Sequence, residues 1–187
     1  MEHVFLRTPI GKLTVAAGGG CITNVFFEGE EPVSTHNAQR AVHNGLSCEN
    51  CKGGNLYPPD SDTAVLQSAA AQLSEYFRGE RKTFDLPVKP AGGAFFRRVW
   101  DIMRREIPYG VTISYSALAA LAGNPEAARA VGMANNRNPI PIIIPCHRVV
   151  GKNGSLTGFR AGVDVKEKLL ELERAGQCAG QWTMINE

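Results

Sequence analysis

The chain has 187 residues, 43% hydrophobic and 20% charged, with a formal net charge of +2, which is the composition of an ordinary soluble globular protein. No apolar run approaches the ~18–20 residues of a transmembrane helix, and the first residues lack the basic and hydrophobic regions of a signal peptide. Five cysteines are too few and too scattered for a disulfide scaffold in a chain of this length. We therefore expect an intracellular protein in a reducing compartment, with no membrane partner.

The basic residues are concentrated in the second half of the chain. Residues 1–95 contain 8 Lys and Arg against 10 Asp and Glu, whereas residues 96–187 contain 12 against 8. A basic C-terminal half is compatible with a polyanionic partner, although uneven halves also occur in many neutral enzymes.

Residues 1–90 have the pattern of a small α/β domain. Short runs of β-forming residues between Gly- and Pro-containing turns predict strands at residues 4–8, 12–17 and 21–28. Residues 29–60 are polar and aperiodic and predict a long loop. Apolar residues at helical spacing predict a helix over 62–78, and the Pro- and Gly-containing segment 80–94 predicts a linker. We place the domain boundary near residue 90.

Residues 91–187 are predicted to form a mostly helical domain. The expected helices cover residues 95–106, 115–121, 125–134 and 165–175. Ser114 is the expected cap of the second helix, and Asn124 followed by a proline is a typical start of the third. Two short helices joined by a tight turn suggest a helix-turn-helix. Asp164 and Glu167 predict a capping box for the last helix.

The segment Pro145-Cys146-His147-Arg148 is the strongest indication of chemistry. Nearby prolines fix the backbone and remove donors, so the preceding residues are expected to form neither a helix nor an ordinary central strand. A buried structural role is the commonest one for a free cysteine. The alternative is a nucleophile whose proton is taken by His147. Adjacent side chains diverge in extended backbone, so a bridging water is the easier arrangement.

Two further positions bear on that choice. Glu173 on the last predicted helix is a candidate to fix the tautomer of His147, the alternative being a solvated helix charge. The helix after Asn124 is rich in alanine and glycine and has one long cation, Arg129. Such a thin face can approach a DNA minor groove and insert a side chain, although small residues more often pack against a core.

These motifs carry a resemblance to a known family. The Pro-Cys-His-Arg-Val motif, the preceding Asn138-Pro139-Ile140-Pro141-Ile142, the pair Ser114-Tyr115 and the segment Ala127 to Gly132 resemble the O6-alkylguanine-DNA alkyltransferases over residues 95–175. The N-terminal half resembles the family in outline. The resemblance implies an α+β fold, with a ribonuclease-H-like N-terminal domain and a helical domain containing a helix-turn-helix.

The resemblance also implies a function. The protein would bind double-stranded DNA from the minor groove, flip out an O6-alkylguanine and move the alkyl group irreversibly to Cys146, so that each molecule acts once. O4-alkylthymine is a second candidate substrate. We expect a monomer that needs no cofactor.

The resemblance assigns roles to individual residues. Cys146 would be the nucleophile, His147 the base through a water, and Glu173 the group that orients His147. Tyr115 would donate a hydrogen bond to the guanine ring, Asn138 would brace the active-site turn, and Arg129 would fill the space left by the base. Contacts to DNA are expected from Tyr115, Ala127, Ala128, Arg129 and Ala130. The alkyl or base pocket is expected to include Pro141, Val149, Phe159 and Arg160. Arg148 has both a structural and a DNA-contact interpretation.

A metal site and two other functions are the alternatives to this assignment. His36, His43, Cys48 and Cys51 cluster in the long loop, but their spacings fit no standard zinc finger, and we expect no metal. A non-catalytic sensor of alkylated bases would lack the nucleophile that Cys146 supplies. An unrelated cysteine hydrolase would turn over repeatedly and would need neither a helix-turn-helix nor Arg129.

Overall fold

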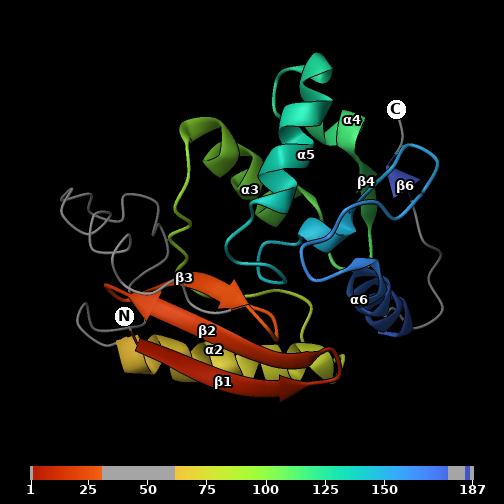
Figure 1. The fold of residues 1–187 in the computed structure, drawn as a ribbon. Coiled ribbons are helices and arrows are strands. Elements are labelled where there is room, and N and C mark those ends of the chain that lie inside the picture. Colours follow the sequence, from red (N-terminus) through yellow and green to blue (C-terminus); the bar gives the residue numbers. More distant parts are fainter. Residues whose placement is uncertain (1, 31–61, 177–183, 186–187) are drawn as a thin grey trace.

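The N-terminal half is a small antiparallel sheet with one helix packed on it (Figure 1). The computed structural model describes residues 2–30, 62–176 and 184–185, so the predicted loop at 29–60 and its His/Cys cluster lie almost wholly outside the described residues. The sheet has the order β1-β2-β3, and α2 contacts all three strands. The elements are β1 (Glu2–Thr8), β2 (Gly11–Gly18), β3 (Cys21–Phe26) and α2 (Asp62–Phe77).

The predicted strands and helix of this half are confirmed, with ends shifted by one or two residues. The central strand β2 is buried from Leu13 to Ala17, because it has a neighbouring strand on each side and α2 packed on one face. The Asp62 carboxylate accepts a hydrogen bond from the Gly20 backbone N–H (2.8 Å), which ties the start of α2 to the turn between β2 and β3.

The C-terminal half is mostly helical, as predicted. Its helices are α3 (Ala94–Glu106), α4 (Tyr115–Leu121), the 3₁₀ turn Pro125–Ala127, α5 (Ala128–Asn136) and α6 (Val163–Ala175). The Ser114 hydroxyl accepts from the Ala117 N–H (3.1 Å), and the Asn124 side chain accepts from the Glu126 N–H (3.2 Å), so both predicted helix starts are confirmed. Trp100 donates to the Ala134 carbonyl (2.7 Å) and joins α3 to α5.

Two features of this half differ from the sequence prediction. The capping box at Asp164 and Glu167 is wrong: α6 begins at Val163, after Gly162 with φ of 97°, and has no side-chain cap. A three-stranded parallel sheet of order β5-β4-β6 was not predicted. It contains β4 (Thr112–Ser114), β5 (Val149–Val150) and β6 (Met184–Ile185). Strands of two or three residues are too short to show a period in the sequence.

The two halves share one continuous hydrophobic core. The predicted linker contains no helix, but it is held in place: the Ile22 N–H donates to the Pro87 carbonyl (2.8 Å) and the Lys89 N–H to the Ile22 carbonyl (2.8 Å). None of the described helices is long and apolar enough to cross a membrane.

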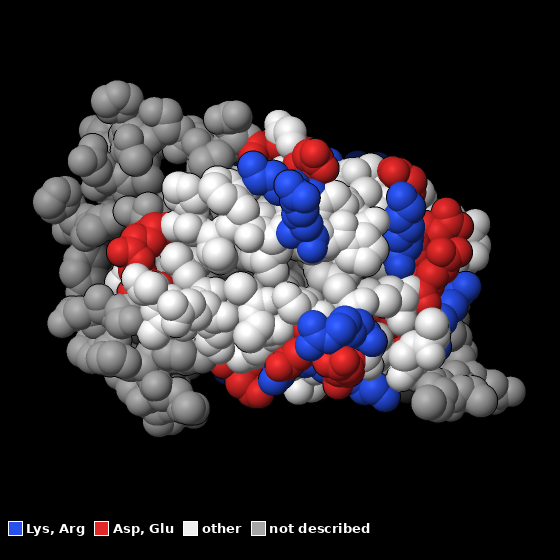
Figure 2. Space-filling view, turned by 90° about the horizontal axis from the view of Figure 1, so that it is seen from below, with Lys and Arg blue, Asp and Glu red and all other residues white. Residues whose placement is uncertain are grey.

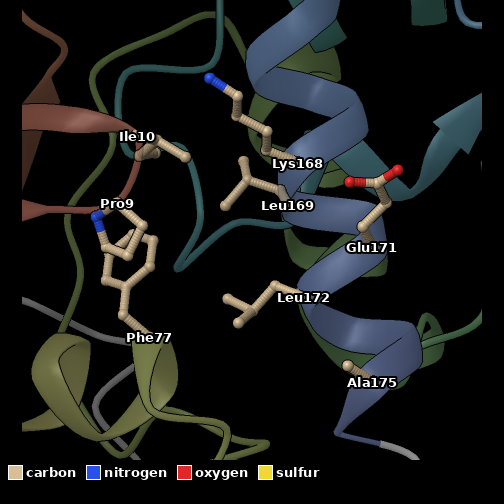
Figure 3. Close-up of a pocket in the computed structure, with 8 residues that line it drawn as sticks. All are labelled: Pro9, Ile10, Phe77, Lys168, Leu169, Glu171, Leu172 and Ala175. Carbon is tan, nitrogen blue, oxygen red and sulfur yellow. The ribbon is translucent and has the colours of Figure 1, made fainter.

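A shallow groove of about 330 Å³ lies where the two halves meet on one side (Figure 3). Pro9 and Ile10 from the turn after β1, together with Phe77 at the end of α2, face the side of α6 that carries Leu169 and Leu172. None of the site residues predicted from the sequence lines this groove.

Candidate active site and DNA-binding groove

Cys146 begins a 3₁₀ turn, Cys146–Arg148, directly after the proline-rich segment. The segment is a tight turn, neither helix nor ordinary strand, as predicted: the Ile144 N–H donates to the Ile140 carbonyl (2.9 Å), and Ile142 has φ of 74°. A left-handed conformation is costly for a β-branched residue and persists only where the surroundings enforce it. The assumption of extended backbone at Cys146 and His147 is wrong, because Pro145 is followed by a helical turn.

The turn is braced from within by Asn138. Its side-chain amide donates to the Ile144 carbonyl (2.8 Å), and its side-chain oxygen accepts from the Ile140 N–H (3.0 Å). Asn138 is buried, and these two bonds join the two ends of the strained segment. The Cys146 thiol that follows is free and only 3% exposed.

Glu173 is fully buried, which excludes the alternative of a solvated helix charge. Its Oε1 lies 2.8 Å from Nε2 of His147, and Arg148 donates to both carboxylate oxygens over 2.9–3.2 Å. The Gly110 N–H donates to Oε2 (2.8 Å), and the Tyr76 hydroxyl donates to Oε1 (2.8 Å). Arg148 also donates to the Ile107 carbonyl (2.6 Å). This buried position gives Arg148 a structural role.

These contacts set the charge states. Burial alone would raise the pKa of Glu173, but His147 and Arg148 outweigh it and hold that pKa well below its usual range. Burial lowers the pKa of His147, so the ring is neutral at rest. Because the carboxylate only accepts hydrogen bonds, the ring proton is on Nε2, and the lone pair is on Nδ1. Nδ1 has no hydrogen-bond partner among the described residues.

Burial raises the pKa of the Cys146 thiol, so the resting side chain is a thiol and needs a base. Asn138 and the positive charge of Lys166 oppose this rise. Nδ1 of His147, on the next residue, has a lone pair without a partner among the described residues and is the candidate base. The arrangement can therefore form a thiolate at a buried position, where a thiolate is a strong nucleophile.

An open groove of about 530 Å³ adjoins this site. It brings together several residues that the sequence predicted to act on DNA or on the base. Its lining comprises Tyr115, Ala128, Arg129, Gly132, Asn136, Thr157, Gly158 and Phe159. Arg129 is exposed on α5, whereas Ala127, Ala128 and Ala130 are half-buried, so the small residues serve both packing and exposed surface. Burial raises the pKa of Tyr115, and nearby Cys146 adds to this rise.

The other predicted pocket residues are placed differently. Pro141 is buried in the turn, and Val149 is fully buried in β5, paired with Ile113 of β4; neither lines the groove. Phe159 lines the groove and also packs edge-on against Phe27 of the N-terminal half, with ring centroids 5.6 Å apart.

Arg160 reaches across to the N-terminal half. Its guanidinium pairs with Glu30 (2.7 Å) and donates to the carbonyls of Val25 (2.9 Å) and Asn138 (3.3 Å). These contacts tie the loop Thr157–Gly162, which borders the groove, to the strand β3 and to the active-site turn.

Removing this tie is expected to loosen the loop more than it destabilises the fold. In Arg160→Ala, amide hydrogen exchange of peptides covering residues 151–162 should rise at least several-fold, because the loop loses three anchoring contacts. A half-exposed ion pair of this kind stabilises a fold by no more than about 1 kcal/mol. Lys152→Ala, at an exposed position of the same segment, is the matched control. Unchanged exchange in Arg160→Ala would show that the loop is held by other contacts.

Sequence reasoning missed Lys166. The side chain is fully buried, and Nζ donates to the carbonyls of Val149 (2.6 Å) and Thr157 (3.1 Å). Burial lowers its pKa to about 8, so it still carries its charge at neutral pH, near Cys146. A signal was present: Lys166 and Glu173 are seven residues apart, on the helix face that also carries Leu169 and Leu170.

The distribution of surface charge is uneven. Figure 2 shows the face that carries β1 and α2, where basic and acidic side chains lie next to one another in small groups beside a broad uncharged area. A polyanion would find no continuous basic surface there. The groove lined by Arg129 belongs to the helical half and is the candidate contact surface predicted from the sequence.

The fold and the site together define a class: an α+β protein with a buried cysteine next to a histidine–carboxylate pair and with an open groove on its helical half. Two family models match the chain. The DNA binding domain of 6-O-methylguanine DNA methyltransferase matches residues 94–175, and the ribonuclease-like domain of the same proteins matches residues 1–90. The chain belongs to the 6-O-methylguanine DNA methyltransferase family.

Individual relatives agree over nearly the whole chain. The methylated-DNA–protein-cysteine methyltransferase of Mycolicibacterium paratuberculosis is 52% identical over 174 residues, 93% of each chain. The constitutive enzyme of that name from Bacillus subtilis is 41% identical over 170 residues, 90% of this chain and 92% of the relative. The crystal structure of Mycobacterium tuberculosis OGT in complex with DNA has a TM-score of 0.75 at 39% identity and covers 94% of each chain.

Proposed function

We propose that this protein repairs DNA by transferring the alkyl group of O6-alkylguanine to Cys146, in a single irreversible event. The observation that carries the proposal is the buried thiol beside a neutral His147, whose ring is oriented by an ionised Glu173. The relatives named methylated-DNA–protein-cysteine methyltransferases, and the DNA complex of the Mycobacterium tuberculosis protein, support the same reaction.

The proposed chemistry follows from the proton positions. The thiol proton passes to Nδ1 of His147 through a water, which leaves a thiolate. The sulfur attacks the alkyl carbon, the bond from that carbon to O6 breaks, and the electron pair stays on the base. The guanine, which has kept the electron pair, then takes up one proton. This proton replaces the one that the thiol lost. The thioether has no leaving group that could regenerate the thiol, and each molecule therefore acts once.

Tyr115 is the proposed donor to the guanine ring. In this structure its hydroxyl donates to the Thr157 carbonyl (3.3 Å), the same oxygen that accepts from Lys166. Burial raises the pKa of Tyr115, so the hydroxyl keeps its proton and can donate it as a hydrogen bond. A base entering the groove would replace the Thr157 carbonyl as the acceptor, while Lys166 continues to hold the loop.

The target base must leave the duplex, because Cys146 is buried and cannot reach a stacked base. Arg129, exposed on α5 at the edge of the groove, is the proposed side chain that fills the gap from the minor-groove side. The packed pair α4 and α5 is the proposed helix-turn-helix that presents it.

The first test is the mass of the intact protein after mixing with a duplex containing O6-methylguanine. The expected result is one added methyl group per protein, located on the peptide containing Cys146, with no further turnover. Binding without a mass change would favour a sensor. Repeated turnover of an ester or peptide would favour a hydrolase, which the family match already argues against. The same assay with O4-methylthymine tests the second substrate.

Arg129→Ala is expected to weaken base flipping far more than folding. Its side chain is exposed, so the thermal midpoint should change little, whereas the single-turnover rate constant should fall about 10-fold or more with loss of the inserted group. Arg137→Ala, an exposed arginine just after α5 that does not line the groove, is the control. Fluorescence of 2-aminopurine next to the lesion reports flipping. If both substitutions lowered the rate constant equally, Arg129 would act only through general electrostatic attraction of DNA.

We also propose that the protein acts inside the cell, where its DNA substrate is, and as a monomer, since one chain contains every residue of the proposed reaction.

A further inference from the structure

The N-terminal half contributes a side chain to the active-site network. We propose that Tyr76 on α2 is a positioning residue for alkyl transfer, which holds Oε1 of Glu173 and moderates the pull of this carboxylate on His147. The proposal rests on the roles proposed above for His147 and Glu173. In the sequence, nothing distinguishes Tyr76 from the other residues on the apolar face of its helix.

The geometry places Tyr76 in direct contact with the carboxylate. Its hydroxyl donates to Oε1 of Glu173 at 2.8 Å, and the same oxygen lies 2.8 Å from Nε2 of His147. Both side chains of the Tyr76–Glu173 bond are fully buried. The tyrosine ring is fixed by the rings of Phe77 (5.3 Å between centroids) and Tyr109 (6.0 Å). The hydroxyl therefore cannot turn away from the carboxylate without moving the core.

The contact spans the two halves of the molecule. Tyr76 and Glu173 are 97 residues apart, on α2 and α6, which belong to different halves (Figure 1). Glu173 has other donors in Arg148 and Gly110, so Tyr76 is not needed to keep it ionised. Tyr76 and Arg148 both donate to Oε1, the oxygen that faces His147, and Tyr76 is the neutral donor of the two. Burial and Glu173 raise the pKa of the Tyr76 hydroxyl.

Loss of the Tyr76 hydroxyl should have a defined effect on His147, the proposed general base. A hydrogen bond to a carboxylate oxygen reduces the negative charge that this oxygen presents to its other partners. Without the Tyr76 hydroxyl, Oε1 would attract the His147 ring proton more strongly and raise the pKa of His147. A protonated His147 cannot accept the thiol proton. The acid limb of the transfer rate should then move to higher pH.

Several other charged or titratable groups act on His147, and the substitution leaves them in place. Glu173 and Lys166 from α6 and Arg148 from the active-site turn act on His147 directly. Tyr109, from the segment before β4, contacts Arg148, and Cys146 is the preceding residue in the chain. These groups are the same in the wild type and in a variant that lacks the Tyr76 hydroxyl. A difference between their His147 pKa values therefore measures the effect of that hydroxyl.

The test is Tyr76→Phe, which removes one oxygen and keeps the ring that fills the core. The single-turnover rate constant for methyl transfer from an O6-methylguanine duplex is measured from about pH 5 to about pH 9, a range that brackets the histidine titration. We expect the midpoint of the acid limb to rise by about half a unit, which lowers the rate constant by up to about three-fold at pH values below the midpoint. Ser74→Ala removes a hydroxyl from the same helix, one that donates to the Ala70 carbonyl (2.8 Å) at an exposed position, and should not move the limb.

A second measurement separates this proposal from the proposed function. The pKa of the His147 ring is followed by NMR in both variants, without DNA, and it should rise in Tyr76→Phe only. An unmoved ring pKa, or a rate that falls equally at every pH, would overturn the role of Tyr76 and leave alkyl transfer standing. A wild-type protein that transfers no methyl group would overturn the proposed function, whereas the ring pKa would still decide whether Tyr76 tunes His147.

Discussion

Cys146→Ala is expected to abolish alkyl transfer completely and to leave binding of the damaged duplex within about two-fold of the wild type, since binding groups are untouched. The thiol is the only proposed acceptor, and Cys146 is buried and does not line the groove, so its loss removes the reaction and not the contact surface. The readouts are the intact mass after reaction and the dissociation constant from fluorescence anisotropy.

Cys21→Ala is the matched control, because Cys21 is the other described cysteine and is likewise buried and in no disulfide. It removes the same atom from the core and should keep one methyl group per protein. Each substitution is expected to lower the free energy of unfolding by about 1 kcal/mol through the small cavity that it leaves. Transfer retained in Cys146→Ala would contradict the proposed mechanism.

Glu173→Gln is expected to impair both folding and transfer. The amide leaves the Arg148 guanidinium buried without an opposite charge, and breaking a buried pair in this way costs about 3–5 kcal/mol of unfolding free energy. The amide also cannot hold the His147 tautomer as the carboxylate does, because its NH₂ group is a donor. The transfer rate should fall by about 10²-fold or more, through loss of general base catalysis.

The pH dependence of stability gives a second check on Glu173. Its folded-state pKa lies below the unfolded value, so its contribution is fully present above the unfolded value and is lost as the pH falls from there toward the folded value. The wild type should therefore lose stability below about pH 4.5, whereas Glu173→Gln should lack this part of the loss.

Glu171→Gln is the matched control for both experiments. Glu171 is exposed on the same helix, at the groove between the two halves (Figure 3). Its neutralisation should change stability by no more than about 0.5 kcal/mol, as is usual for a surface substitution. If Glu173→Gln behaved like this control in denaturant titrations at neutral pH, the buried network would not be a determinant of stability.

The local elements of this protein follow from the sequence because their signals are local. Strands, helix ends and the proline-rich turn before Cys146 depend on residues within a few positions of one another, as at Ser114 and Asn124. The motif Pro145-Cys146-His147-Arg148 likewise predicts Cys146 as the nucleophile and places His147 next to it. The predicted capping box of α6 is wrong, because the helix begins after Gly162 without a side-chain cap. The short parallel strands were missed, because they are too short to show a period.

The identity of the candidate site residues was thus predicted from the sequence, but their electrostatic environment was not. The burial of Glu173 and its pairing with Arg148 depend on how α6 packs against the active-site turn. The same packing buries Lys166 near the thiol, although the spacing of Lys166 and Glu173 on one helix face would have indicated it.

The contacts between the two halves are decided by packing alone. Tyr76 reaches Glu173 over 97 residues, and Arg160 reaches Val25 over 135. No local pattern selects such partners, because a tyrosine on an apolar helix face and an arginine in a loop have many equivalent partners in the unfolded chain. Joining the two halves in one core brings these particular groups together and excludes water from them, and a hydrogen bond to a buried carboxylate acquires its influence only there.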